Sequence, residues 1–478
     1  MSTPFEHRLV LANWMLSLFE VKNFGDLASH LKDPVLEGFD EEGISKYHQV
    51  VRLVVDRKKL LNDELLTYDG NIVRHWKQIT HRRNSDGQVL YPKYFQYLGL
   101  LFTELYLDRF FRDDEALLRD LNNYREEFNA GMTSQQKNQN GQLFPDGLPT
   151  DIQVKGFEKA DLKKLAYWSA TGSGKTLMMH INILQYQHYL AKSGKLRDIN
   201  RIILLTPNEG LSKQHRDEFH LSGLDAELFN KDSGRLFTGQ SIEIIDIHKL
   251  KETAGEKTVS VDAFEGNNLV LVDEGHRGTS GGEVGIWMER RNRLCEKGFS
   301  FEYSATFGQA MKASGDKQLS HEYAKCILFD YSYKYFYADG YGKEYRILNL
   351  EDDSDRDHRQ RYLTACLLAF YQQQKLYINK HDEIRQYLIE KPLWIFVGGS
   401  VTKKPSEKDV SDVVDILLFL SGFVKNRQRS IQYLDMILRG DSGLHDTNGL
   451  DIFMGAFSYL GTLGKNGEQT FDDIMKVL

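Results

Sequence analysis

The stretch WSATGSGKTLMMH, residues 168–180, constrains the fold more than any other part of the sequence. It fits a phosphate-binding loop, in which G-x-x-x-x-G-K-[ST] leads into a helix. Ser169 stands where the first glycine is usual. In such a loop, backbone N–H groups and the lysine approach the phosphates, and the threonine hydroxyl can hold Mg²⁺. The pattern predicts that a nucleoside triphosphate is bound by Thr171, Gly172, Ser173, Gly174, Lys175 and Thr176.

The sequence around this loop predicts a parallel sheet. From about residue 151, short apolar runs such as RIILLT, SIEIIDI and NLVLVDE alternate with helical segments such as TLMMHINILQYQHYLAK. Compact apolar runs that alternate with helices are typical of a parallel sheet with helices on both faces. Ligands of such sheets bind beyond the carboxyl ends of the strands. We therefore expect the functional side chains at those ends.

The rest of the chain divides by pattern. Helical spacing in YFQYLGLLFTELYLDRFF predicts a helical N-terminal domain, and a polar, Gln/Asn-rich stretch follows it. Near the C-terminus, RILNL and KPLWIFVGG predict strands among helical stretches, as at the start of a second α/β domain. The predicted parts are a helical domain over 1–130, a linker over 131–150, an α/β domain over 151–315, a connector over 316–345 and a partial second α/β domain over 346–478.

Composition predicts a cytoplasmic protein that does not span a membrane. The net charge is −7, so any contact with nucleic acid must use a local basic groove. The longest apolar run, Val413–Val424, is too short to span a bilayer. Cys295, Cys326 and Cys366 lie far apart and lack metal-site spacing, which predicts reduced thiols in a cytosolic protein.

Three further strand ends carry polar residues. Asp273 and Glu274 follow an apolar run, where the aspartate can hold Mg²⁺ and the glutamate can orient and deprotonate a water molecule. Acidic residues after a strand can also simply decorate a helix N-terminus. The other two ends are the TPN stretch at 206–208 and the SAT stretch at 304–306, and each alone could be a turn or a cap. Their combination with the phosphate loop favours one catalytic edge.

ATGSGKT, TPN, DEGH and SAT, in this order, resemble motifs I, Ia, II and III of superfamily 2 helicases and translocases. That family tolerates a residue other than glycine at the position of Ser169. DEGHRG, LFDYSYKYFYADGYGKEYRI and KPLWIFVGGSVTKK are most similar to the motor subunit of type III restriction enzymes and related phage-defence helicases. The resemblance covers roughly residues 150–478. It implies a RecA-like domain followed by an incomplete second RecA-like domain with a helical insertion.

The resemblance also implies roles for individual residues. Lys175 and Thr176 would bind ATP and Mg²⁺, and Asp273 and Glu274 would serve the metal and the water. In the family, a glutamine upstream of the loop often reads adenine; Gln153 is one match, or a solvated linker residue. The remaining roles are coupling of the nucleotide site to nucleic acid, by His276, Ser304 and Thr306, and contact with nucleic acid, by Thr206, Pro207 and Ser400.

The pattern departs from the family after Ser400. No convincing later motif with an arginine finger follows, and Arg427, Arg429 and Arg439 read as a solvated helix face. The restriction-type nuclease signature is also missing. The sequence therefore predicts the front part of a longer motor, completed by a missing C-terminal half or by other subunits of a defence complex.

Two functions remain open. The first is an ATP-dependent motor on DNA, with a duplex favoured over RNA. The second is an adaptor that binds a partner protein and is switched by ATP. A GTPase is disfavoured, because no Asn-Lys-x-Asp motif is present. Outside the motor region, the basic stretch RHWKQITHRR (74–83) is either a DNA contact or a solvated face.

Overall fold

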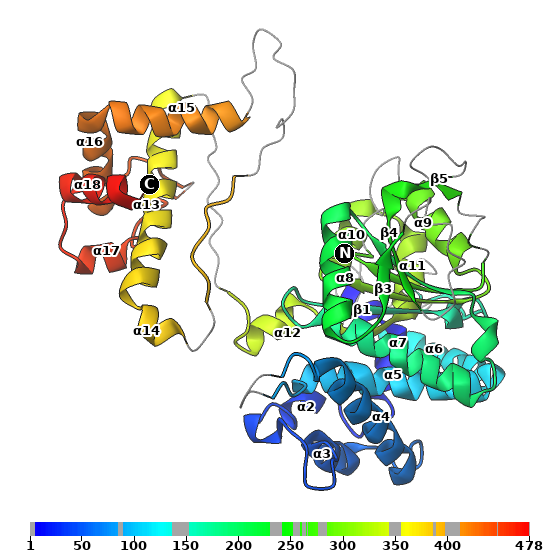
Figure 1. Cartoon of the computed structure of the whole chain (residues 1–478). Helices are drawn as coiled ribbons and strands as arrows, with labels where there is room; N and C mark the ends of the chain where they lie inside the picture. Colours follow the sequence, from blue (N-terminus) through cyan, green and yellow to red (C-terminus); the bar gives the residue numbers. More distant parts are fainter. Residues whose placement is uncertain are drawn as a thin grey trace. The chain divides into compact units, whose positions relative to one another are not determined.

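The structure, a computed structural model, describes most of the chain as two compact units, Met1–Lys343 and Glu344–Leu478. Each unit is described by itself (Figure 1). The described residues are 5–84, 89–135, 153–229, 241–251, 259–260, 264, 266–275, 284–343, 355–385, 389–396, 412–446 and 448–477.

The first unit is built around a seven-stranded parallel sheet with the strand order β3-β4-β2-β7-β8-β1-β9. Its strands are β1 (Lys164–Ser169), β2 (Arg201–Thr206), β3 (Ala226–Leu228), β4 (Ile242–Asp246), β7 (Asn268–Asp273), β8 (Phe299–Ser304) and β9 (Ile327–Tyr331). A separate small pair consists of β5 (Leu250–Lys251) and β6 (Val259–Ser260). The α/β class with a parallel sheet is therefore confirmed.

Helices cover both faces of this sheet (Figure 1). They are α7 (Lys175–Lys192), α8 (Glu209–Leu221), α9 (Val284–Leu294), α10 (Phe307–Ser314) and α11 (Lys317–Cys326), and the short α12 (Tyr333–Ala338) follows the edge strand β9. Alternate residues of β1 point to opposite faces, as the two-residue repeat of a strand requires. Leu165 and Tyr167 join the core that α7 shares, whereas Ala166 and Trp168 pack with residues of α10 and α11.

The N-terminal region is helical, as predicted. Its helices are α1 (Val10–Leu16), α2 (Phe24–Ser29), α3 (Lys46–Val54), α4 (Asn62–Thr80), α5 (Tyr94–Arg112) and α6 (Asp114–Gln135). Every residue of α5 from Tyr94 to Asp108 is buried, because the helix packs on α4, α7 and β9. These helices and one face of the sheet form a single apolar core.

Residues 316–345, expected to be a connector, contribute to the sheet itself. They hold α11, the edge strand β9 and α12, and β9 pairs with β1. The strand is only five residues long and directly follows a helix, so its apolar pattern is too short to stand out.

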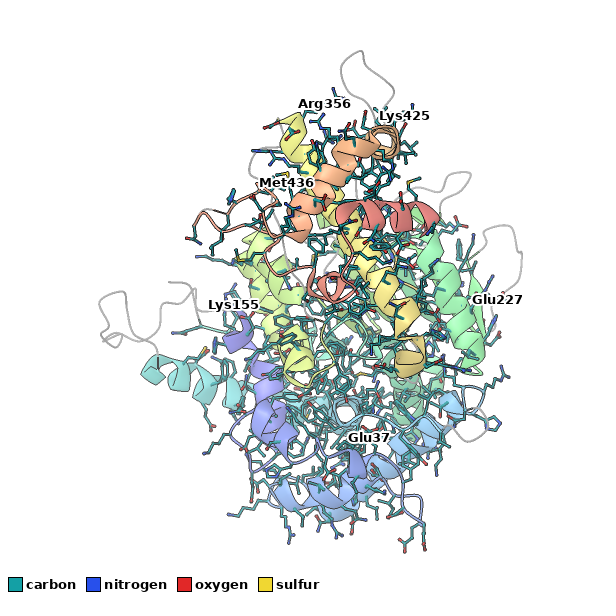
Figure 2. The ribbon with its side chains drawn as sticks, turned by 90° about the vertical axis from the view of Figure 1, so that its left-hand side faces the viewer. Glu37, Lys155, Glu227, Arg356, Lys425 and Met436 are labelled. Carbon is teal, nitrogen blue, oxygen red and sulfur yellow. The ribbon has the colours of Figure 1, made fainter. Side chains whose placement is uncertain are left out.

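The second unit is helical in its described residues, apart from one isolated bridge. Its helices are α13 (Arg356–Asn379), α14 (His381–Ile384), α15 (Asp412–Lys425), α16 (Arg427–Leu438), α17 (Ser458–Thr462) and α18 (Gly467–Val477). Figure 2 labels Arg356 at the start of α13, Lys425 at the end of α15 and Met436 in α16. They enclose a core of their own. Throughout the described part of the chain, each helix is too short or too polar to cross a bilayer.

The buried strand expected over 391–399 is absent from residues 391–396, which have no regular structure. Leu393 is 83% exposed and Ile395 73% exposed, because no neighbouring strand pairs with this segment among the described residues. The strand expected at RILNL lies outside the described residues. By contrast, the predicted solvated arginine face is present: Arg427 pairs with Glu468 and Asp472 of α18.

Candidate nucleotide site

The predicted phosphate loop joins β1 to α7 at the carboxyl edge of the sheet. Gly172 and Gly174 have φ values of 87° and 84°, a left-handed conformation that favours glycine. Lys175 Nζ donates to the Ser169 carbonyl oxygen at 3.3 Å. The missing first glycine therefore does not prevent a loop of this form, since Ser169 supplies a backbone atom to the lysine. Thr176 lies half-buried in the first turn of α7.

The acidic pair lies at the end of β7 on the same edge. Burial lowers the pKa of Lys175, and the charges of Glu274 and Asp273 counter that effect, so the lysine and both carboxylates share one site. Glu274 has a φ of 57°, the one positive value outside glycine in the described residues. Left-handed backbone at such a residue costs on the order of 1–3 kcal/mol and is common at functional sites.

His215 is a site residue that the sequence analysis missed. It lies on α8, and its Nε2 atom is 3.0 Å from Asp273 Oδ2. Burial works against ionisation of Asp273, but the hydrogen bond and charge of His215, with Lys175, leave the pKa of this carboxyl below its ordinary value. Asp273 is thus held ionised, as a metal ligand must be. No spacing rule links a histidine in one helix to the end of another strand.

Gln96 is a second missed residue. It lies in the first turn of α5, and its Nε2 atom donates to the Ser173 carbonyl oxygen in the phosphate loop at 3.0 Å. A Cβ on residue 174 would collide with this amide, so the close approach requires the glycine. Gln153, the glutamine singled out in the sequence, precedes Val154, which exchanges two hydrogen bonds with Asn129 of α6. The glutamine that the structure brings to the loop is Gln96.

Some of the residues expected to couple the nucleotide site to nucleic acid, or to contact nucleic acid, are buried, and others lie outside the described residues. Ser304 ends β8, and its Oγ accepts from the Thr306 N–H at 3.0 Å, while the Thr306 hydroxyl is buried without a hydrogen-bond partner. Thr206 and Pro207 are buried, and the Thr206 hydroxyl lies 2.6 Å from Ser212 Oγ. A nucleic acid could therefore not reach either side chain in this conformation. His276 and Ser400 lie outside the described residues.

Some side chains of the basic stretch 74–83 make contacts within the protein. Trp76 is buried and its Nε1 atom donates to the Leu90 carbonyl oxygen. Arg83 pairs with Glu218 of α8 at 2.7 Å, and Arg82 donates to the His220 carbonyl oxygen. Arg82 and Arg83 thus attach the residues after α4 to α8, whereas Arg74, Lys77 and His81 are exposed.

Residues 148–309 match the family described as type III restriction enzyme, res subunit. The resemblance seen in the motifs is confirmed over these residues. No curated protein sequence matches the chain.

Solved structures similar to the chain include a helicase domain and an ATPase core. One is the Hef helicase domain of Pyrococcus furiosus, at 12% identity and a TM-score of 0.27, with 66% of each chain covered. Another is the Sulfolobus solfataricus SWI2/SNF2 ATPase core in complex with double-stranded DNA, at 12% identity and a TM-score of 0.24. There the alignment covers 62% of this chain and 59% of the other. The chain thus spans slightly less than two thirds of the length of these structures.

Proposed function

We propose that this chain is an ATP-dependent nucleic-acid motor of a restriction or phage-defence system, acting on duplex DNA. The observation that carries the proposal is the convergence of Lys175 with Asp273 and Glu274 at the carboxyl edge of the sheet. The family match over residues 148–309 supports it.

The side chains fit ATP with Mg²⁺. A magnesium ion is commonly held by one or two carboxylates together with substrate phosphates, and Asp273 is ionised and beside Lys175. Thr176 and Asp273 would hold the cation, which neutralises charge on the phosphates when bound. Lys175 places its own charge on the β- and γ-phosphates. Glu274 orients the attacking water molecule and accepts its proton.

We propose a different glutamine for the contact with the base. The resemblance implies a glutamine that reads adenine, and Gln96 rather than Gln153 lies against the phosphate loop. We assign the adenine contact to Gln96. Its amide offers both a donor and an acceptor, which is the combination that the edge of adenine requires.

Steady-state ATP hydrolysis tests the function, with wild-type chain, Lys175→Ala and Glu274→Gln compared in the presence and absence of duplex DNA. We expect Lys175→Ala to lose both nucleotide binding and turnover. Glu274→Gln should still bind ATP but lose about 10²-fold or more in turnover, because general-base catalysis contributes about 10²–10⁴-fold. Wild-type turnover equal to that of Lys175→Ala, with and without DNA, would contradict the proposal.

The alternative is an adaptor in which ATP binding switches a protein interaction. The observation that favours it is the helical second unit, whose described residues form no strand that could complete a second motor domain. ATP-dependent binding of a partner protein, with no effect of DNA on turnover, would select this function. Stimulation of turnover by duplex DNA would select the motor.

A further inference from the structure

A buried cluster of charged side chains lies beneath the turn that carries Asp273 and Glu274. We call it the Glu302 cluster, after the carboxylate in strand β8 at its centre. Its members come from β1, β8, α9 and α11, and they are Lys164, Arg291, Glu302, Glu322 and Tyr323. None of these residues is needed for the roles assigned above. A buried charged group is costly unless it is paired, so each contact in the cluster has a structural consequence.

The charges of the cluster are paired. Glu302 is fully buried, and its Oε1 atom lies 2.9 Å from Arg291 Nη1 and 3.0 Å from Lys164 Nζ. Glu322 lies 2.5 Å from Lys164 Nζ. The charge of Lys164 lowers the pKa of Glu322 to about 2, even though burial acts in the opposite direction. Two cations and two anions therefore balance, with Glu302 and Arg291 fully buried and Glu322 partly exposed.

Tyr323 connects this balanced cluster to the catalytic turn. Its hydroxyl accepts from Arg291 Nη1 at 3.2 Å and lies 2.7 Å from Glu302 Oε2. The hydroxyl has one proton, which it shares between Glu302 Oε2 and, at 3.2 Å, the carbonyl oxygen of Gly275, the residue directly after Glu274. The phenol is fully buried, and Lys164 Nζ lies 4.6 Å from the centre of its ring. Contacts with Arg291, Glu302 and Lys164 thus fix the position of the Tyr323 side chain.

Gly275 is held at both of its backbone polar atoms. Its N–H donates to the Tyr303 carbonyl oxygen at 2.9 Å, and its own carbonyl faces the Tyr323 hydroxyl. A side chain at position 275 would press against Glu302, so the turn lies directly on the cluster. The left-handed backbone of Glu274 is therefore flanked by a residue that cannot rotate freely. Strained backbone persists only where the surroundings determine it, and this pair of contacts does so.

We propose that Tyr323 is a positioning residue for hydrolysis: its hydroxyl holds the Gly275 carbonyl and thereby keeps Glu274 in the conformation that orients the attacking water. The inference rests on the proposed function for its kinetic consequence. The structural part, that Tyr323 fixes the turn, does not depend on it. A purely structural tyrosine would instead contribute stability alone.

The substitution Tyr323→Phe keeps the ring and its packing but removes the hydroxyl and its contacts with Gly275, Glu302 and Arg291. Tyr106→Phe is the matched control. The Tyr106 hydroxyl is also buried and also donates to a backbone carbonyl, that of Leu162, at 2.9 Å. That carbonyl precedes β1, at the opposite edge of the sheet from the site. Both variants should melt at lower temperatures than the wild type, and Tyr323→Phe at the lower of the two, because it also loses the contacts of the hydroxyl with Arg291 and Glu302.

Two measurements on the full chain then test whether Tyr323 positions the turn for hydrolysis. Amide hydrogen exchange of the peptide covering 271–275 should be at least several-fold faster in Tyr323→Phe and unchanged in Tyr106→Phe. The kcat for ATP should fall about 10-fold in Tyr323→Phe, with KM and the affinity for a fluorescent ATP analogue unchanged, since misplacement of a catalytic group slows chemistry more than binding. Tyr106→Phe should keep the wild-type kcat.

Unchanged exchange at 271–275 in Tyr323→Phe overturns the inference. So does faster exchange with a wild-type kcat, because the turn would then move without consequence for hydrolysis. Wild-type turnover no greater than that of Lys175→Ala is a different result: it removes the proposed function and the kinetic role, while the exchange data still establish whether Tyr323 holds the turn.

Discussion

Gln96 meets the phosphate loop from a position 77 residues earlier in the chain. Its amide is oriented by contacts at both ends: Oε1 accepts from the Lys93 N–H at 2.9 Å and Nε2 donates to Ser173. The first contact caps the start of α5, which a glutamate would do equally well. The second contact needs a donor, which a glutamate lacks.

We therefore expect Gln96→Glu to preserve the fold and weaken the nucleotide site. Loss of the donor and the new negative charge near the phosphates should reduce ATP affinity by about 10-fold, the effect of roughly 1.4 kcal/mol. The preference for ATP over GTP should narrow, because the base contact is lost. Binding of fluorescent ATP and GTP analogues measures both effects.

The matched control is Gln153→Glu, which changes the glutamine beside α6 by the same chemistry. It should bind both nucleotides as the wild type does. A loss of affinity in Gln153→Glu, with Gln96→Glu unaffected, would return the adenine contact to the glutamine that the sequence first singled out.

Some residues of the candidate site can be predicted from the sequence, and others cannot. Lys175, Asp273 and Glu274 are visible because phosphate and metal chemistry require these types at strand ends. The sequence does not predict a role for Gln96, His215 or Tyr323, because each reaches the site from a separate helix. Their contacts depend on how α5, α8 and α11 pack, and no local pattern records that packing.

At the scale of elements, the contact between α5 and α7 carries a buried polar network. Glu104 of α5 is fully buried and accepts from Tyr189 and Gln185 of α7 and from Asn71 of α4. Burial raises the pKa of Glu104 to about 7, although all three donors act to lower it. The ordinary value is 4.5, so the folded protein binds this proton more tightly than the unfolded chain does.

This difference in proton affinity determines how the stability of the folded state changes with pH. Between about pH 4.5 and 7 the folded state holds more protons at Glu104 than the unfolded state, so stability from this group falls as pH rises. The slope approaches about 1.4 kcal/mol per pH unit at most. Urea unfolding of the wild type and of Glu104→Gln at pH 5, 6, 7 and 8 measures it. The advantage of the wild type over the variant should shrink from pH 5 to pH 7 and then level off.

Other buried carboxylates titrate in the same range, but they are present in both proteins and cancel in the comparison. A difference between wild type and Glu104→Gln that stays constant from pH 5 to pH 8 would show that Glu104 does not change its proton affinity on folding.

The elements themselves were predictable to different degrees. β2, β7 and β8 are visible in the sequence because each is a compact apolar run with a turn after it. The segment at 391–396 has the same apolar character but lies exposed outside any strand. Apolar composition alone therefore does not make a strand, because a strand also needs a neighbour with which to pair.

At the scale of the whole molecule, the N-terminal helices and the sheet are one folding unit. Gly99 of α5 comes so close to Met178 of α7 and Phe329 of β9 that a Cβ there would collide with the methionine. Both of those side chains are buried. The sequence separates residues 1–130 from the ATPase region because their patterns differ, whereas packing joins them through a shared core.

We accordingly expect the α/β region to fail to fold without α1–α6. A fragment of residues 153–343 would expose the apolar faces of α7 and β9 that α5 covers, and large exposed apolar patches lead to aggregation. A fragment of residues 1–343 keeps the shared core, so it should melt in one cooperative transition and bind ATP as the full chain does. Circular dichroism melting and size-exclusion chromatography of both fragments measure the difference. A monomeric, cooperatively melting 153–343 fragment would mean that the N-terminal helices are an attached domain, and the contact of Gln96 with the phosphate loop would then be one that the ATPase does not need in order to fold.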